Sequence, residues 1–154
     1  MLLKAPDNST FEMKLLAYAY PGAKDDRWYP NMLSVHLSIS YADGTIAKAT
    51  TYLLTSEVNR LIAWFDALLH RREAAAELHF YHGELRFELF ETCAETVAFR
   101  TYFHFNRGRE STLPKKRRER DVWLGYLEFG LSYPQLETIL LTLKDEAALL
   151  PQRV

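Results

Sequence analysis

Two histidines near the middle of the chain, His79 and His82, come closest to the spacing of metal ligands. Side chains three positions apart on a strand point to opposite faces, so the pair could share a metal only if a turn at Gly83 brought them together. No cysteine or further ligand at a suitable spacing supports such a site. We therefore expect one histidine at the edge of the core, one in a turn, and no metal.

Cys93 and the carboxylates are the other residues that could do chemistry. A nucleophilic cysteine needs a partner base and a lowered pKa, and no residue near Cys93 in the sequence supplies either. Asp25 and Asp26 could form an acid–base pair with Glu12 or Glu57 only if the fold brought them together. The sequence contains no glycine-rich phosphate loop, no Gly-x-Ser-x-Gly and no His-Glu-x-x-His. It therefore predicts no catalytic residue and no cofactor.

The strongest charge feature is the segment 106–120. It holds seven lysines and arginines and two glutamates, a net charge of +5, whereas the whole chain carries −1. Its run Lys115, Lys116, Arg117 and Arg118 could contact phosphates. The segment lacks the interleaved aromatic residues of a single-strand binder, and no known DNA-binding module accompanies it. We expect an exposed loop that is solvated or contacts an acidic protein.

Length and composition indicate one soluble domain spanning residues 1–154. The chain is 48% hydrophobic and 25% charged, which is enough to bury a sizeable core. Its 14% of aromatic residues favours strands over a helical bundle. A single cysteine suits a reducing cytoplasm, and we find neither a signal peptide nor a membrane-spanning stretch in the sequence.

The elements that must position these residues follow from periodicity. Alternating apolar and polar residues predict strands at 11–20, 32–41, 46–53, 76–82, 84–92, 96–106 and 122–131. Helical spacing predicts amphipathic helices over about 56–72 and 133–150. Thr55 or Ser56 can cap the first helix, and Ser132 with Gln135 has the spacing of a capping box at the second. The expected fold is α+β, with one twisted antiparallel meander of six to seven strands.

Five short motifs, taken in order, resemble the WapI-type immunity proteins, small bacterial antitoxins encoded beside secreted polymorphic toxins. They are Ala19-Tyr20-Pro21, Asp25-Asp26 with Asn31-Met32-Leu33, the helix entry Leu53-Leu54-Thr55-Ser56-Glu57, the pair Leu78-x-Phe80 and Leu85-x-Phe87, and the closing Glu128-Phe129. The resemblance covers about residues 11–150. The chain departs from the family pattern at Met32, where the family has an aromatic residue, and at Tyr81-His82-Gly83-Glu84.

The resemblance implies a protein that binds and neutralises a cognate toxin, the C-terminal domain of a secreted protein, and it implies no catalytic residues. Charge complementarity speeds such association, and the sequence offers two candidate surfaces of opposite sign. The acidic one contains Asp25, Asp26, Glu84 and Glu88, with Trp28 nearby. The basic one contains Arg107, Arg109, Lys115, Lys116, Arg117 and Arg118.

Three alternatives stay open at this point. The basic loop could bind nucleic acid, which is less expected than a protein partner. A small enzyme could form its site only in three dimensions, if a deep pocket joined His79 or His104 to carboxylates. The chain could also pair with a second copy of itself.

Overall fold

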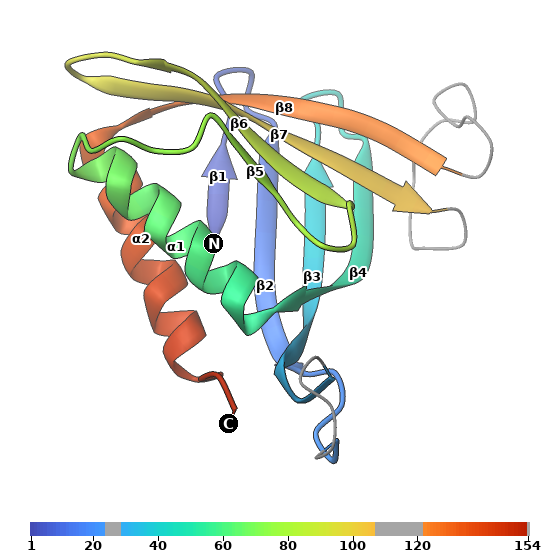
Figure 1. Ribbon diagram of the computed structural model, residues 1–154. Coiled ribbons are helices and arrows are strands. Elements are labelled where there is room, and N and C mark those ends of the chain that lie inside the picture. Colours follow the sequence, from blue (N-terminus) through green and yellow to red (C-terminus); the bar gives the residue numbers. More distant parts are fainter. Residues whose placement is uncertain (24–28, 107–121, 154) are drawn as a thin grey trace.

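The computed structural model describes residues 1–23, 29–106 and 122–153, and its strands form two four-stranded antiparallel sheets (Figure 1). The first sheet has its strands in chain order: β1 (Leu2–Lys4), β2 (Thr10–Tyr18), β3 (Met32–Ser40) and β4 (Ile46–Leu54). A short 3-10 turn, Tyr29–Asn31, precedes β3.

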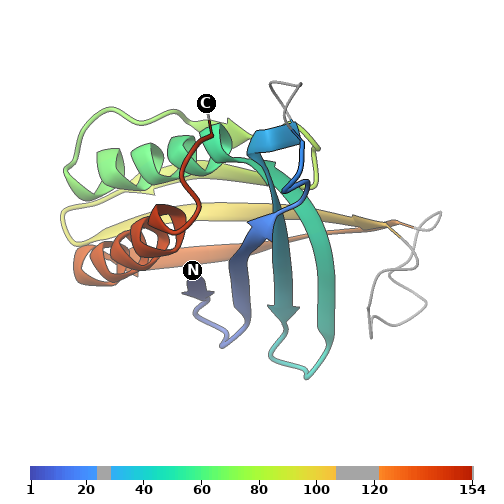
Figure 2. The same ribbon diagram turned by 90° about the horizontal axis from the view of Figure 1, so that it is seen from below.

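The second sheet follows helix α1 (Thr55–Leu69) and also keeps chain order: β5 (Glu77–His79), β6 (Leu85–Thr92), β7 (Thr96–Asn106) and β8 (Val122–Ser132). Helix α2 (Tyr133–Ala148) comes last and packs against α1. Both helices lie on one side of the second sheet, beside the first sheet (Figure 2).

The α+β class and the two amphipathic helices are confirmed, whereas the arrangement of the strands differs from the prediction. The described residues contain eight strands in two sheets rather than six or seven in one. Helix α1 separates β4 from β5, and alternation alone does not reveal which strands pair. Strand β1 has three residues, too few for a recognisable alternation.

Local chemistry accounts for the turn between β3 and β4 and for the helix starts. Gly44 adopts a φ of 84°, and Asp43 accepts a hydrogen bond of 2.9 Å from the backbone N–H of Thr45. Ser132 and Gln135 form the expected capping box of α2. The N-cap of α1 is Leu54 rather than Thr55 or Ser56. Leucine has no capping oxygen, and the structure keeps only the other half of a capping box, in which the Glu57 carboxylate accepts the Leu54 backbone N–H at 2.8 Å.

The core lies between the two sheets and the inner faces of the helices. Trp64 and Phe65 of α1 contact the rings of Phe87 and Phe99 on the second sheet, with centroids 5.6 to 6.0 Å apart. Phe11 of the first sheet meets Phe87 at 6.4 Å. All of these side chains are buried, so the inner face of the β5–β8 sheet is fixed by a packed aromatic cluster.

Candidate functional site

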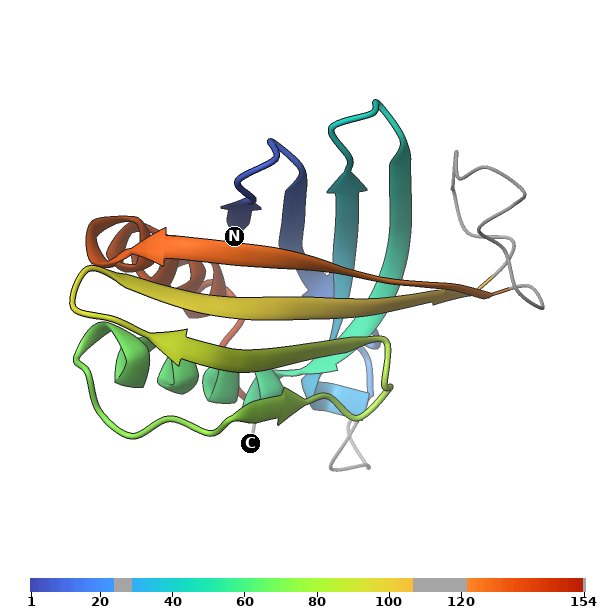
Figure 3. The same ribbon diagram turned by 90° about the horizontal axis from the view of Figure 1, so that it is seen from above.

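Neither helix of the described residues, α1 or α2, covers the outer face of the β5–β8 sheet (Figure 3). Strand register places outward side chains in two rows that cross all four strands. The aromatic row is His79, Arg86, Tyr102 and Tyr126, and the charged row is Glu77, Glu88, Arg100 and Glu128. Residues directly opposite on neighbouring strands are close enough to interact, so each row places its four side chains next to one another across the sheet.

Stacking orders the aromatic row. The Arg86 guanidinium lies 3.9 Å from the centroid of the Tyr102 ring, and the Tyr102 and Tyr126 rings are 5.5 Å apart. The Tyr102 hydroxyl donates a hydrogen bond of 2.6 Å to Glu88 of the charged row. Because the rings and the guanidinium hold one another, this part of the face keeps its shape before any partner arrives.

The charged row contains three glutamates and one arginine, a formal charge of −2. Arg100 donates a hydrogen bond of 2.7 Å to Glu128, and this bond is the main reason that the pKa of Arg100 is raised above its usual value. Glu77 accepts from His79 at 2.6 Å and contacts Arg86 at 3.5 Å. The row is therefore acidic overall while most of its members are held in place.

Two large aromatic side chains on this face are exposed to solvent. Phe90 is 50% exposed and Tyr126 is 52% exposed. The guanidinium of Arg100 lies between them, 5.1 Å from the Phe90 ring and 5.4 Å from the Tyr126 ring. Tyrosine, other aromatic residues and arginine are enriched where proteins bind one another.

The outer face of the β1–β4 sheet provides the contrast within the same molecule. The central outward positions of its strands carry small polar or charged side chains, namely Glu12, Lys14, Ser34, His36, Ser38, Lys48 and Thr50. This composition is typical of a solvated sheet face. The central part of this face therefore differs from the second sheet, and the exposed aromatic residue of β4, Tyr52, lies near the end of its strand.

A second exposed aromatic group, the tyrosine cluster, consists of Tyr20, Tyr29, Tyr52 and Tyr81. Tyr20 contacts Tyr29 at 5.0 Å and Tyr52 at 6.5 Å between ring centroids, and His82 joins Tyr52 to Tyr81 at 6.0 and 5.2 Å. His82 and Tyr81 belong to the turn between β5 and β6. This turn connects the tyrosine cluster to the outer face of the second sheet.

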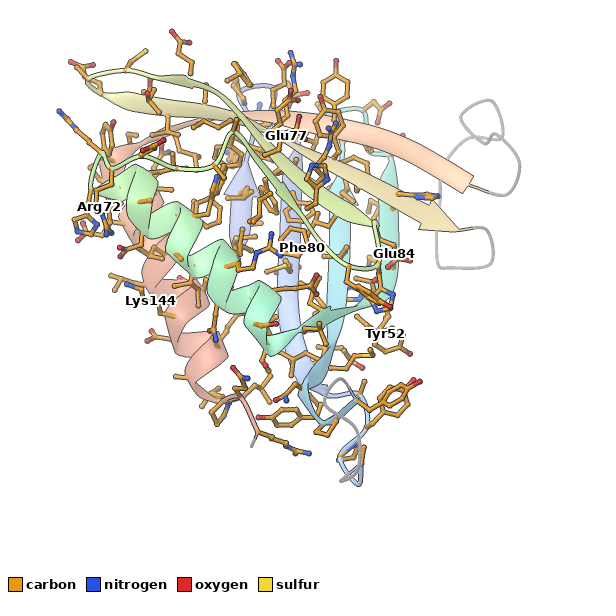
Figure 4. The ribbon with its side chains drawn as sticks, viewed as in Figure 1. Tyr52, Arg72, Glu77, Phe80, Glu84 and Lys144 are labelled. Carbon is orange, nitrogen blue, oxygen red and sulfur yellow. The ribbon has the colours of Figure 1, made fainter. Side chains whose placement is uncertain are left out.

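The structure separates the predicted acidic residues. Glu88 lies in the charged row, whereas Glu84 lies in the turn before β6 (Figure 4). The other candidate contact residues lie outside the described residues: Asp25, Asp26, Trp28, Arg107, Arg109, Lys115, Lys116, Arg117 and Arg118. Sequence reasoning missed Phe90, Arg100 and Tyr126. They could have been recognised from the sequence, because they lie at outward positions of predicted strands. A solvated sheet face seldom carries large aromatic rings at such positions.

The other residues singled out for chemistry have structural surroundings. Cys93 is exposed, and its hydrogen bond to Glu91 is the first cause of a raised thiol pKa, which disfavours a nucleophilic thiolate. Glu12 pairs with Lys14 at 3.0 Å, and Glu57 is buried at the start of α1. Within the described ranges no three histidine, cysteine or acidic side chains gather as a metal site.

A hollow of 430 Å³ on the outer face contains both histidines that could have belonged to an enzyme site, His79 and His104. The described residues that line it include Arg86, Tyr102 and Tyr126 and no carboxylate. His79 forms a hydrogen bond of 2.6 Å with Glu77, whose carboxylate is not among the described lining residues.

The fold and this face define a small α+β protein with a preformed exposed sheet surface. The model of the immunity protein WapI-like family matches residues 1–151, so the chain belongs to the WapI-like immunity protein family. No curated protein and no solved structure matches the chain significantly. Membership implies toxin neutralisation as the general role, a toxin as the general partner, and a non-enzymatic mode of action. Of the helices in the described ranges, none is both long and apolar enough to cross a membrane.

Proposed function

We propose that this protein acts as a single domain in the cytoplasm and neutralises a cognate toxin by covering it with the outer face of the β5–β8 sheet. The toxin is the C-terminal domain of a secreted protein encoded beside this chain, and the bound sheet occludes its active surface. An inhibitor of this kind needs a rigid, complementary surface rather than catalytic groups.

The observation that carries the proposal is the placement of Arg100 between the exposed rings of Phe90 and Tyr126. The three side chains come from three adjacent strands whose inner face is buried in the core. A few well-positioned aromatic and arginine side chains commonly supply most of the binding free energy of an interface. Among the described residues, the central outward positions of the other sheet carry small polar or charged side chains instead.

Charge favours a basic surface on the toxin. The charged row carries a formal charge of −2, and Glu77 and Glu128 have side chains that are 42% and 49% exposed. An acidic face attracts a basic partner over long range and speeds association at low salt. Toxins that act on RNA bind a polyanion, so their active surfaces tend to be basic and would suit this face.

The interface extends over the β5–β6 turn. Gly83 of this turn lines the hollow on the outer face, and His82 beside it contacts Tyr52 of the tyrosine cluster. We place the centre of the contact at Phe90, Arg100 and Tyr126 and its edge at the tyrosine cluster, because central residues usually contribute more than those at the edge.

Co-expression tests the function. A cell that produces the neighbouring toxin domain should resume growth when this protein is co-expressed, and the two purified proteins should form a complex. The double variant Phe90→Ser, Tyr126→Ser should lose both effects, whereas the control Ser38→Ala, Thr50→Ala on the outer face of the first sheet should keep them. Rescue that survives the first double variant would exclude this face as the toxin-binding surface.

A further inference from the structure

The hollow on the outer face lies where the aromatic row reaches the β5–β6 turn. Gly83 adopts a φ of 66° in this turn, and the hollow is lined there by Gly83 and on β8 by Gly125. Arg86 and His104 line the hollow from β6 and β7. Its 430 Å³ is enough for an inserted side chain of a partner.

Arg86 is the charged group of this hollow, and most of its hydrogen-bonding capacity is available. The Tyr102 ring holds its guanidinium at 3.9 Å, and its acidic contact in the described residues is the 3.5 Å approach to Glu77. That pair is exposed on both sides, so it contributes little. A guanidinium has five N–H donors in a planar fork that fits a carboxylate with two parallel hydrogen bonds.

His104 supplies a second polar group. Its Nε2 atom is buried and has no hydrogen-bond partner among the described residues. A buried polar atom without a partner costs free energy, which a ligand that reaches it would recover. His79, at the opposite edge of the hollow, is already bonded to Glu77 at 2.6 Å.

Among the described lining residues there is one formal positive charge, on Arg86, and no negative charge. We propose that this hollow receives an aspartate or glutamate side chain of the toxin, with the carboxylate on Arg86 and the methylene groups against Tyr102 and Tyr126. The neighbouring charged row excludes a polyanion such as RNA, because its continuing phosphates would lie over Glu77, Glu88 and Glu128. A single carboxylate adds one negative charge beside this row instead of a series of phosphates, so it meets less of that repulsion.

This inference rests on the proposed function, but its first test uses the free protein. Acetate, titrated at constant ionic strength, serves as the carboxylate probe, and acetamide serves as its neutral match. Acetate should produce saturable NMR shifts of the Gly83 and Gly125 amides and of the Arg86 side-chain N–H. Acetamide should not, and Arg86→Met should abolish the response whereas Lys48→Met should retain it. The inference is overturned if acetate shifts none of these signals or shifts them equally in Arg86→Met.

Measurements of toxin binding then distinguish the proposed carboxylate site from the proposed interface. Arg86→Met should weaken toxin binding by about tenfold or more, and Arg86→Lys should recover only part of the loss because it cannot form two parallel bonds. If Arg86→Met binds the toxin normally while Phe90→Ser, Tyr126→Ser does not, the carboxylate site is wrong and the proposed interface stands. If both variants bind normally, the proposed interface fails as well.

Discussion

Arg100 on β7 donates a hydrogen bond of 2.7 Å to Glu128 on β8, and the two residues stand directly opposite in the strand register. The pair holds a guanidinium between two exposed rings on the outer face of the sheet. A side chain that is already ordered loses less conformational entropy when a partner binds.

Removing the charge of the residue that pairs with Arg100 should therefore weaken toxin binding while changing the stability of the fold only slightly. Glu128→Gln should change the free energy of unfolding by less than about 1 kcal/mol, because exposed ion pairs contribute little. The same variant should weaken toxin binding by about threefold to tenfold, since the hydrogen bond that holds Arg100 is no longer charge-assisted and the charged row loses an acidic group. Urea unfolding and calorimetric titration measure the two effects. A large loss of stability with unchanged affinity would contradict this interpretation.

The centre and the edge of the proposed interface should differ in energy. Tyr126→Ala should weaken toxin binding by about tenfold to a hundredfold, whereas Tyr81→Ala, in the β5–β6 turn, should change it by about threefold or less. Tyr81 is 73% exposed, so removing its ring should leave the fold intact. Dissociation rates of the two variants, compared with the wild type, measure the difference. The reverse ranking would place the centre of the contact on the tyrosine cluster.

Glu57 should support the fold rather than the interface. Its buried carboxylate accepts the backbone N–H groups of Leu54 and Tyr81, so it joins the start of α1 to the β5–β6 turn. Glu57→Ala leaves both donors without this acceptor and should lower the free energy of unfolding by about 1–3 kcal/mol. Glu57→Gln keeps one side-chain oxygen and should lose less. Equal stability of the alanine variant and the wild type, measured in urea, would refute the role.

Asp66 links the two helices and should make stability depend on acid pH. Lys144 of α2 donates a hydrogen bond of 3.2 Å to it, which is the largest cause of its lowered pKa, and Arg72 pairs with it as well (Figure 4). A carboxyl whose pKa is lowered by folding contributes stability above the ordinary aspartate pKa of about 3.9 and loses it as the pH falls through the lower value. Tm should therefore fall less steeply with acid in Asp66→Asn than in the wild type. The exposed carboxylate variant Asp145→Asn is the control and should follow the wild type.

The alternation of β3 and the spacing of the helices were enough to predict the α+β class and both helices. The split into two sheets was not predictable in this way, because it depends on which strands pair across α1 and not on the pattern within any strand. The family resemblance, drawn from ordered motifs, is confirmed.

The candidate site was predicted less well, because the prediction was based mainly on runs of charged residues in expected loops. The exposed rings come from outward positions of predicted strands, and only the distances in the structure show that Phe90 and Tyr126 flank Arg100. Of the acidic candidates, Glu88 lies on this face because it is an outward residue of β6. Which side chains lie next to one another on neighbouring strands depends on how the strands pair. The pattern of residues within one strand does not determine that pairing.

Thiol protection in the toxin complex tests the location of the interface most directly. In a Cys93→Ser background, Gly130→Cys introduces one thiol on β8 next to the charged row, where an added Cβ meets no atom within 4 Å. Thr50→Cys places the matched thiol on the outer face of the first sheet. Binding through the β5–β8 sheet predicts that the toxin strongly slows modification of the first thiol and leaves the second unchanged. Protection of the second thiol alone would contradict it.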